Sequence, residues 1–287
     1  MDKTRWNDLR PDEATLARLR ERAQFVRLET IRLIEIAKVG HYTSVFSAAE
    51  IFAALYYDVM RLSDDPKWPD RDRFLMGKGH AAVGLFAILA DKGYLPEEVL
   101  NGYTRLGNPL GDHPDMRKVP GVDFSSGSIG HALSNGVGMA LGGRMQGRDF
   151  TTFVMLGDGE MQEGQVWEAA LAAAHHGLSR LVAIVDRNGY QLDGAVDDVM
   201  GIEPLDAKWR GFGWDVEVVD GHDLSALTVA LRAAKADIAR IAPACIIART
   251  VKGKGVSYME TEPGWHLGYL DPSDAEAARA EILSKVI

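Results

Sequence analysis

Residues 152–189 decide the fold, and they read TFVMLGDGEMQEGQVWEAALAAAHHGLSRLVAIVDRNG. The apolar runs at 152–156 and 181–186 have the length of buried strands. Between them, residues 163–176 have the length of a helix, and Gly177 is a typical helix stop. A strand, a helix and a strand in this order form a βαβ unit, which predicts two parallel strands joined by a right-handed crossover.

The same alternation continues on both sides of this unit. Alternating strands and helices indicate an α/β fold with a doubly wound, mostly parallel sheet and helices on both faces. No repeat or linker divides the sequence, so residues 1–287 are expected to form a single domain. Further strands are predicted at 74–76, 214–219 and 245–248, and further helices at 81–91 and 224–239.

Helices are also expected near both ends of the chain. An apolar stripe predicts an N-terminal helical segment over 12–40, and a C-terminal helix is expected over about 272–285. The second helix is expected to begin at Ser47, because Ser47 and Glu50 form a Ser-x-x-Glu pattern typical of a capping box.

Residues 101–128 lack a clear hydrophobic period, and a long irregular stretch of this kind is more often functional than idle.

The composition excludes several classes of partner. A formal charge of −9 argues against nucleic acid and anionic membranes, which need an excess of basic residues. No apolar run approaches the roughly 20 residues needed to cross a bilayer. Cys245 is the only cysteine, so no intrachain disulfide can form. A soluble, cytoplasmic protein is expected.

Two polar residues follow the strands of the central unit. Asp158 follows the first strand and Asn188 follows the second. In open parallel sheets ligands bind beyond the carboxyl ends of the strands, and both residues offer the oxygen ligands that Mg²⁺ and Ca²⁺ prefer. The helix that begins near Glu163 directs its N-terminal amides at the same place, which favours a phosphate group. A helix cap and an Asn-Gly turn are the simpler alternatives for each residue alone, but the pair together favours a metal site.

Gly157-Asp158-Gly159, followed after 28 intervening residues by Asn188, resembles the thiamine-diphosphate motif. In proteins with this motif, the Asp and Asn side chains and one main-chain carbonyl hold a metal on the cofactor diphosphate. The resemblance implies that Asp158, Asn188 and the carbonyl of Tyr190 are metal ligands. It also implies thiamine diphosphate as cofactor, with Mg²⁺ as the metal and Ca²⁺ or Mn²⁺ as alternatives.

Other segments narrow the resemblance to the transketolase family, over nearly the whole chain and in the family's order. In chain order, the matching segments are Val39-Gly40-His41, Lys78-Gly79-His80-Ala81, Gly111-Asp112-His113-Pro114, Pro120-Gly121-Val122, Ser126-Gly127-Ser128-Ile129-Gly130, the GDGEMQEG stretch at 157–164, and Gly264-Trp265-His266.

The resemblance implies roles for individual residues. Active-site histidines of the family bind sugar hydroxyls and diphosphate and move protons, and here they would be His41, His80, His113 and His266. Glu163 matches a glutamate that lies near the subunit interface and couples two cofactor sites. Apart from the resemblance, the basic residues that could meet a phosphate are Arg71, Arg73, Arg117, Lys252 and Lys254, with solvated surface charge as the alternative. The expected cofactor contacts are Gly127, Ser128, Ile129, Gly157, Asp158, Gly159, Glu163, Asn188, Leu192, His80 and His266.

The sequence ends where the pyrimidine-binding domain of a full-length transketolase would begin. The resemblance therefore implies the α subunit of a split transketolase, which transfers a two-carbon ketol unit from a ketose or ketose phosphate to an aldose. A separate β subunit would supply the catalytic glutamate, in an α₂β₂ heterotetramer. The alternatives are the α subunit of a 2-oxo acid dehydrogenase or decarboxylase, a non-catalytic cofactor-binding partner, and a Mg²⁺-dependent nucleotide-binding protein.

Two positions depart from the family pattern. Transketolases usually continue the early Gly-His with Pro-Gly, whereas Tyr42 and Thr43 follow His41 here. A serine usually precedes the lysine of the Lys-Gly-His-Ala segment, and Gly77 stands there instead. Both departures lie beside residues that are expected to face the substrate, so they are either neutral changes or changes that reshape the pocket.

Overall fold

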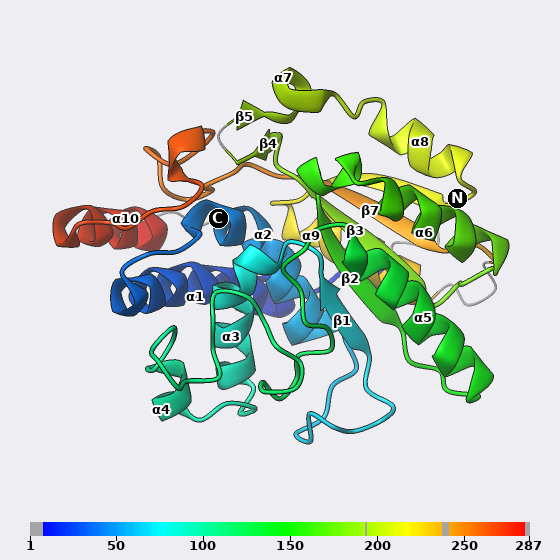
Figure 1. The fold of residues 1–287 in the computed structure, drawn as a ribbon, viewed down its shortest axis with the longest axis horizontal. Helices are drawn as coiled ribbons and strands as arrows, with labels where there is room; N and C mark the ends of the chain where they lie inside the picture. The colour runs from blue at the N-terminus through cyan, green and yellow to red at the C-terminus, as the bar shows by residue number, and fades with distance from the viewer. Residues whose placement is uncertain (1–7, 193, 237–240, 285–287) are drawn as a thin grey trace.

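The computed structural model describes residues 8–192, 194–236 and 241–284. Its centre is a five-stranded sheet whose strands all run parallel, in the order β1-β2-β3-β7-β6 (Figure 1). A short antiparallel pair, β4 and β5, lies outside this sheet. The strands are β1 Arg73–Met76, β2 Thr152–Gly157, β3 Leu181–Arg187, β4 Tyr190–Gln191, β5 Gly194–Ala195, β6 Asp215–Asp220 and β7 Ala244–Arg249.

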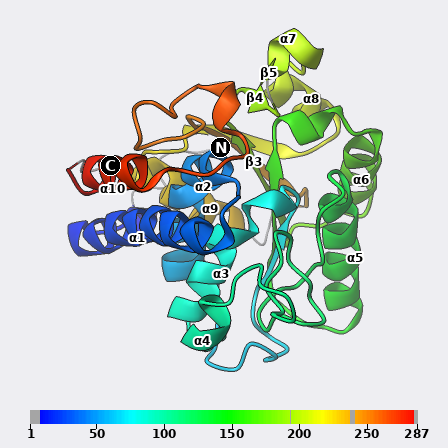
Figure 2. The same cartoon turned by 60° about the vertical axis from the view of Figure 1, so that its left-hand side comes forward.

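Helices cover both faces of the sheet, which confirms the predicted α/β class. Alternate strand residues point to opposite faces, so Phe153 and Met155 join one apolar core while Val154 and Leu156 join another. Figure 2 shows α5 and α6 on one side of the sheet and α1 to α3 on the other. The first core contains residues of α1 Glu13–Ala37, α2 Tyr42–Ala54, α3 Ala82–Asp91, α9 Leu224–Ala236 and α10 Pro272–Ser284; the second contains residues of α5 His131–Met145, α6 Gly164–His175 and α8 Leu205–Gly211.

The central unit consists of β2, α6 and β3, as the sequence predicts. The register pairs Gly157 with Asp186, so the two strands end side by side. The helices predicted near the two ends of the chain are α1 and α10, and the other predicted strands and helices are also present. The predicted ends of two helices, at 237–239 and at 285, lie outside the described residues. Within the described ranges, no helix is both long and apolar enough to span a membrane.

The predicted start of the second helix at Ser47 is wrong. The helix α2 begins at Tyr42, which places Ser47 inside it. Ser47 is fully buried, and its hydroxyl donates to Asp186 Oδ2 at 2.7 Å. Glu50 pairs with Arg27 instead of turning back to cap the helix. Ser47 and Glu50 therefore contact distant segments of the chain instead of capping a helix.

A fully buried ion pair joins α1 to α2. Arg27 Nη1 and Nη2 donate to the two carboxylate oxygens of Glu50 at 2.7 and 2.8 Å. Burial by itself would raise the pKa of Glu50, but the Arg27 charge and a hydrogen bond from His222 lower that pKa from 4.5 to about 2. Glu50 therefore stays charged in the interior at neutral pH.

We predict that Glu50→Gln destabilises the chain and flattens its acid response. At pH 7 the free energy of unfolding should fall by ~3–5 kcal/mol, because Arg27 is left buried without its counter-ion. Since the folded-state pKa is depressed, the stability due to Glu50 is complete above pH 4.5 and is lost as the pH falls toward 2. Urea unfolding over a pH series measures both effects.

The matched control is Glu21→Gln, which removes the exposed partner of Arg22 on α1 and should change stability by less than about 0.5 kcal/mol. Equal acid responses in the wild type and Glu50→Gln would contradict the assigned role of the pair.

Candidate active site

The carboxyl ends of β2 and β3 bring the predicted metal-site residues together. Asp158 directly follows β2, and Asn188 follows β3. Asp158 Oδ2 accepts the Gly189 N–H at 2.6 Å, and Asn188 Oδ1 accepts the Tyr190 N–H at 3.0 Å. The turn at 188–190 is therefore held against the Asp158 carboxylate.

Asp158 is a buried carboxylate, and among the described residues its hydrogen bonds come from main-chain N–H groups. Burial raises the pKa of Asp158 to about 6, and the charge of Asp186 adds to the rise. A cation bound at Asp158 would favour the ionised form and offset this effect. Asp186 is fully buried at the end of β3 and has its own donors, the side chains of Ser47, Lys78 and Thr250.

Three of the predicted active-site histidines form a triangle. Their ring centroids lie 5.0 Å apart for His41 and His80, 5.2 Å for His41 and His266, and 5.3 Å for His80 and His266. His80 Nε2 lies 3.1 Å from Ser44 Oγ. Burial, and then the charge of Lys78, lower the pKa of His80 well below 6.5, so its ring is neutral at neutral pH. The triangle joins segments that are far apart in the sequence.

The fourth predicted histidine, His113, reaches the same region through Asp112. Asp112 Oδ1 lies 3.5 Å from His41 Nδ1, and Asp112 Oδ2 lies 3.7 Å from His113 Nδ1. His113 also lies beside Gly127, where an added Cβ would come within 3.6 Å of His113 Cδ2. Asp112 is thus a carboxylate between two predicted active-site histidines, a role that its sequence context does not signal.

The loop at 126–130 packs closely against the predicted site. A Cβ at Gly79 would meet Ser126 Oγ at 2.6 Å and Gly127 N at 3.0 Å. A Cβ at Gly130 would meet Glu163 Cβ at 2.8 Å. Glu163 itself is exposed at the N-terminus of α6. The helix α6 begins one residue after the predicted start, because a 3₁₀ turn at Gly159–Gln162 separates it from Asp158.

A buried lysine lies between the histidine triangle and the loop that follows β4. Lys252 is almost fully buried, and its Nζ donates to the Leu192 carbonyl at 3.1 Å and lies 3.3 Å from His266 Nδ1. The alternative of solvated surface charge is therefore wrong for Lys252. Leu192 and Ile129 keep exposed side chains, at 66% and 37% relative exposure.

The family description "Transketolase, thiamine diphosphate binding domain" matches residues 19–283. The chain belongs to the transketolase family. It is 40% identical over 265 residues to the "6-deoxy-6-sulfo-D-fructose transketolase subunit SqwG" of Clostridium sp. (strain MSTE9), covering 92% of this chain and 96% of that subunit. It is also 40% identical over 259 residues to an apulose-4-phosphate transketolase subunit of Phocaeicola vulgatus, covering 89% of this chain and 91% of that subunit.

Full-length transketolases match along one part of their length. The human transketolase is 36% identical over 279 residues, which are 96% of this chain but 44% of the human protein. A solved structure of the Leishmania mexicana transketolase superposes with a TM-score of 0.85 at 27% identity, covering 93% of this chain and 44% of that one. These matches confirm the prediction of a split-transketolase α subunit, a transferase of the transketolase type with a thiamine diphosphate-binding domain.

Glu160 is a buried acid in the transketolase motif to which the sequence patterns assigned no role. It accepts the Gly130 N–H at 2.7 Å and the Gly157 N–H at 3.0 Å, so it ties the motif to the loop before α5. Burial raises the pKa of Glu160 to about 7. Its place next to Gly159 was visible in the sequence, but its main-chain partners were not.

The structure shows close packing at both departures from the family pattern. A Cβ at Gly77 would overlap both carboxylate oxygens of Glu160, so only glycine fits there while Glu160 holds its two main-chain bonds. Tyr42 and Thr43 are fully buried rather than open to a substrate. Thr43 Oγ1 donates to the Trp265 carbonyl at 3.1 Å, and this contact links the His41 segment to the His266 segment.

We predict that Gly77→Ser destabilises the chain by ~1–3 kcal/mol, because the new side chain must displace the Glu160 carboxylate. Removal of that carboxylate in Glu160→Ala should make the second substitution cheaper, so the double variant should lose less than the sum of the single losses. Denaturant unfolding of the four proteins measures the coupling.

Gly138→Ser is the control, because Gly138 is exposed on α5 and its added Cβ would meet nothing within 4 Å. If the effects of Gly77→Ser and Glu160→Ala on the free energy of unfolding are additive, contact with Glu160 is not the reason for glycine at position 77.

Proposed function

We propose that this chain, with a separate partner subunit, transfers a two-carbon ketol unit from a ketose or ketose phosphate to an aldose. The observation that carries the proposal is the Asp158 carboxylate held against the 188–190 turn at adjacent strand ends. Oxygen ligands at this edge suit a metal bound to diphosphate, and the neighbouring histidines suit a substrate with several hydroxyls. Family membership favours ketol transfer over the 2-oxo acid dehydrogenase alternative.

The strand-end residues fit thiamine diphosphate with a divalent metal. The side-chain oxygens of Asp158 and Asn188 and the Tyr190 carbonyl would hold Mg²⁺, or Ca²⁺ or Mn²⁺ in its place. The fit rests on Asp158, a buried carboxylate whose hydrogen bonds among the described residues come from the Gly159 and Gly189 N–H groups. Burial raises its pKa to about 6 despite the nearby Lys78 charge, and a bound cation would favour its ionised form. Lys252 adds a buried positive charge for the diphosphate. When bound, thiamine diphosphate supplies the carbon nucleophile that carries the ketol unit.

The histidines would bind and orient the sugar. His41, His80 and His266 place their rings around one point, where their nitrogen atoms can donate to or accept from hydroxyl groups. The lowered pKa keeps His80 neutral, so one ring nitrogen can donate a hydrogen bond to a sugar hydroxyl and the other can accept one, without a permanent charge in the site. His113 and Asp112 would contact the same substrate from the 101–128 segment.

The partner subunit would complete the site. In our proposal it brings the glutamate that faces the aminopyrimidine ring of the cofactor, and two copies of each chain form an α₂β₂ assembly. Glu163 is exposed beside the 126–130 loop, where a second subunit can reach it. The exposed side chains of Ile129 and Leu192 would cover apolar parts of the cofactor.

We predict that ketol transfer requires both chains. The donors to test are 6-deoxy-6-sulfo-D-fructose and apulose-4-phosphate, which are named for two relatives, and xylulose-5-phosphate and fructose-6-phosphate, which are named with Pichia stipitis transketolase structures. Each is assayed with Mg²⁺ and thiamine diphosphate, with this chain alone and with the partner subunit. Ketol transfer that occurs only when both chains are present supports the proposal, and full activity of this chain by itself would refute it.

We predict that Asp158→Asn raises the dissociation constant of thiamine diphosphate in Mg²⁺ by at least ~10–100-fold. Loss of a residue that only supports a metal ligand costs this much, and Asp158 is expected to be a ligand itself. Fluorescence titration of the two-chain complex measures the dissociation constant, and residual turnover is measured in parallel. The control is Asp198→Asn on the exposed face of α7, Val196–Met200. Loss of binding with unchanged turnover would instead support the alternative of a non-catalytic cofactor-binding partner.

A further inference from the structure

The segment that follows β7 places Lys252 at the site. Residues 250–254 leave the carboxyl end of β7, on the same sheet edge as Asp158 and Asn188. Lys252 contacts the Leu192 carbonyl and approaches His266, so its position depends on the path of this segment. We call residues 250–254 the lysine loop.

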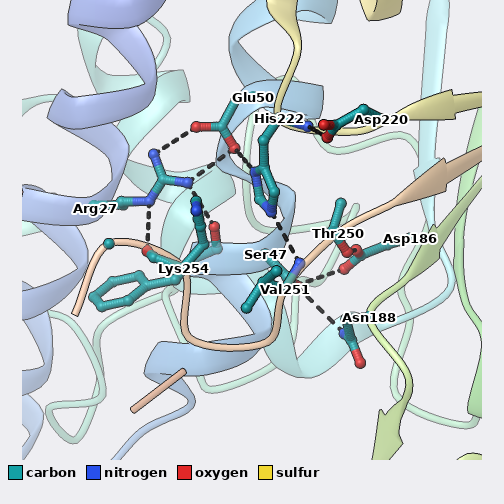
Figure 3. Close-up of polar contacts among 12 residues, drawn as sticks. Arg27, Ser47, Glu50, Asp186, Asn188, Asp220, His222, Thr250, Val251 and Lys254 are labelled. Atoms are coloured by element: carbon teal, nitrogen blue, oxygen red, sulfur yellow. Dashed lines mark hydrogen bonds and ion pairs between the residues drawn. The ribbon is translucent and has the colours of Figure 1, made fainter. Parts of the chain in front are cut away.

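Buried Arg27 and Glu50, together with the mostly buried His222, hold the lysine loop on both sides of Lys252 (Figure 3). On one side, the Val251 N–H donates to His222 Nε2 at 2.9 Å. On the other side, Arg27 Nε donates to the Lys254 carbonyl at 3.0 Å. Glu50 joins the two anchors, because its carboxylate pairs with Arg27 and its Oε2 lies 2.8 Å from His222 Nδ1.

The hydrogen bonds fix the tautomer of His222. A main-chain N–H can only donate, so Nε2 of His222 must be the acceptor of the Val251 N–H. The ring proton then lies on Nδ1 and is donated to Glu50. The His222 main-chain N–H donates to Asp220 Oδ1 at 2.9 Å, which fixes the start of the side chain as well. His222 is therefore a directional bridge between a buried charge and the lysine loop.

Two further contacts fix the shape of the lysine loop. Thr250 Oγ1 donates to Asp186, the buried carboxylate that also accepts from Ser47. Gly253 has φ +80°, and an added Cβ there would overlap the Met259 carbonyl. The loop is therefore held at both ends and packed too closely in the middle to take another path with the same contacts.

We propose that Arg27, Glu50 and His222 are positioning residues for the cofactor site, which act by holding the lysine loop so that Lys252 stays between Leu192 and His266. This inference rests on the proposed function, because it takes the Lys252 charge to act on the bound diphosphate. A buried ion pair is weak support for stability when apolar groups could fill the same space. These polar groups instead make directional contacts with the loop. His222 accepts the Val251 N–H before Lys252, and Arg27 donates to the Lys254 carbonyl after it.

The test compares His222→Leu with His222→Gln. Leucine fills the space but can neither accept from Val251 nor donate to Glu50, whereas the glutamine amide offers both an acceptor and a donor, as the imidazole does. Hydrogen–deuterium exchange of the full chain reports the protection of residues 249–256. Titration of the two-chain complex with thiamine diphosphate and Mg²⁺ reports the dissociation constant.

We expect exchange in this segment to be faster in His222→Leu, the dissociation constant to rise at least tenfold, and both values to return toward wild type in His222→Gln. The matched control is Asp58→Asn, which breaks the paired contact between Asp58 and Arg232 of α9. It should lower the melting temperature without changing exchange in 249–256 or cofactor affinity.

The proposal is overturned by wild-type exchange in His222→Leu, or by faster exchange with unchanged cofactor affinity. An equal loss of affinity in Asp58→Asn would also overturn it, because general destabilisation would then explain the effect. A wild-type complex that binds no thiamine diphosphate would refute the proposed function itself, while the exchange data would still show whether His222 holds the lysine loop.

Discussion

The parallel pairing of β2 with β3 is the constraint on which the site depends. Because Gly157 pairs with Asp186, the residues after both strands emerge together, and the Gly189 N–H reaches the Asp158 carboxylate. Side chains on alternate faces of these strands are buried in two apolar cores, so a shift of one residue would exchange the faces. Packing in the two cores therefore fixes the register between β2 and β3. This register in turn sets which residues meet at the carboxyl ends of the two strands.

Buried charge is the second feature of the site, and its buried acids are stabilised in two ways. Glu50 is neutralised by Arg27, and Asp186 is met by Lys78 and two hydroxyl groups. Asp158 and Glu160 rely on main-chain N–H groups, and burial raises the pKa of each. This contrast separates structural carboxylates, which already have cations, from Asp158, whose charge a bound cation would stabilise.

The fold and the motif residues were predictable because they depend on local signals. Apolar strand lengths, helix stops and the GDG turn identified the βαβ unit and the edge at Asp158. The start of α2 was mispredicted because a local capping pattern at Ser47 was outweighed by tertiary contacts. The burial of Lys252 and its support from His222 depend on segments that meet only in the folded chain, so no spacing in the sequence could reveal them.

The most direct test of the proposed site is a crystal structure of the two-chain complex grown with thiamine diphosphate and Mn²⁺, with anomalous scattering used to locate the metal. We predict one strong anomalous peak on the cofactor diphosphate, within about 2.0–2.4 Å of an Asp158 carboxylate oxygen, Asn188 Oδ1 and the Tyr190 carbonyl. A diphosphate bound elsewhere, or a metal that contacts none of these three groups, would contradict the proposed site.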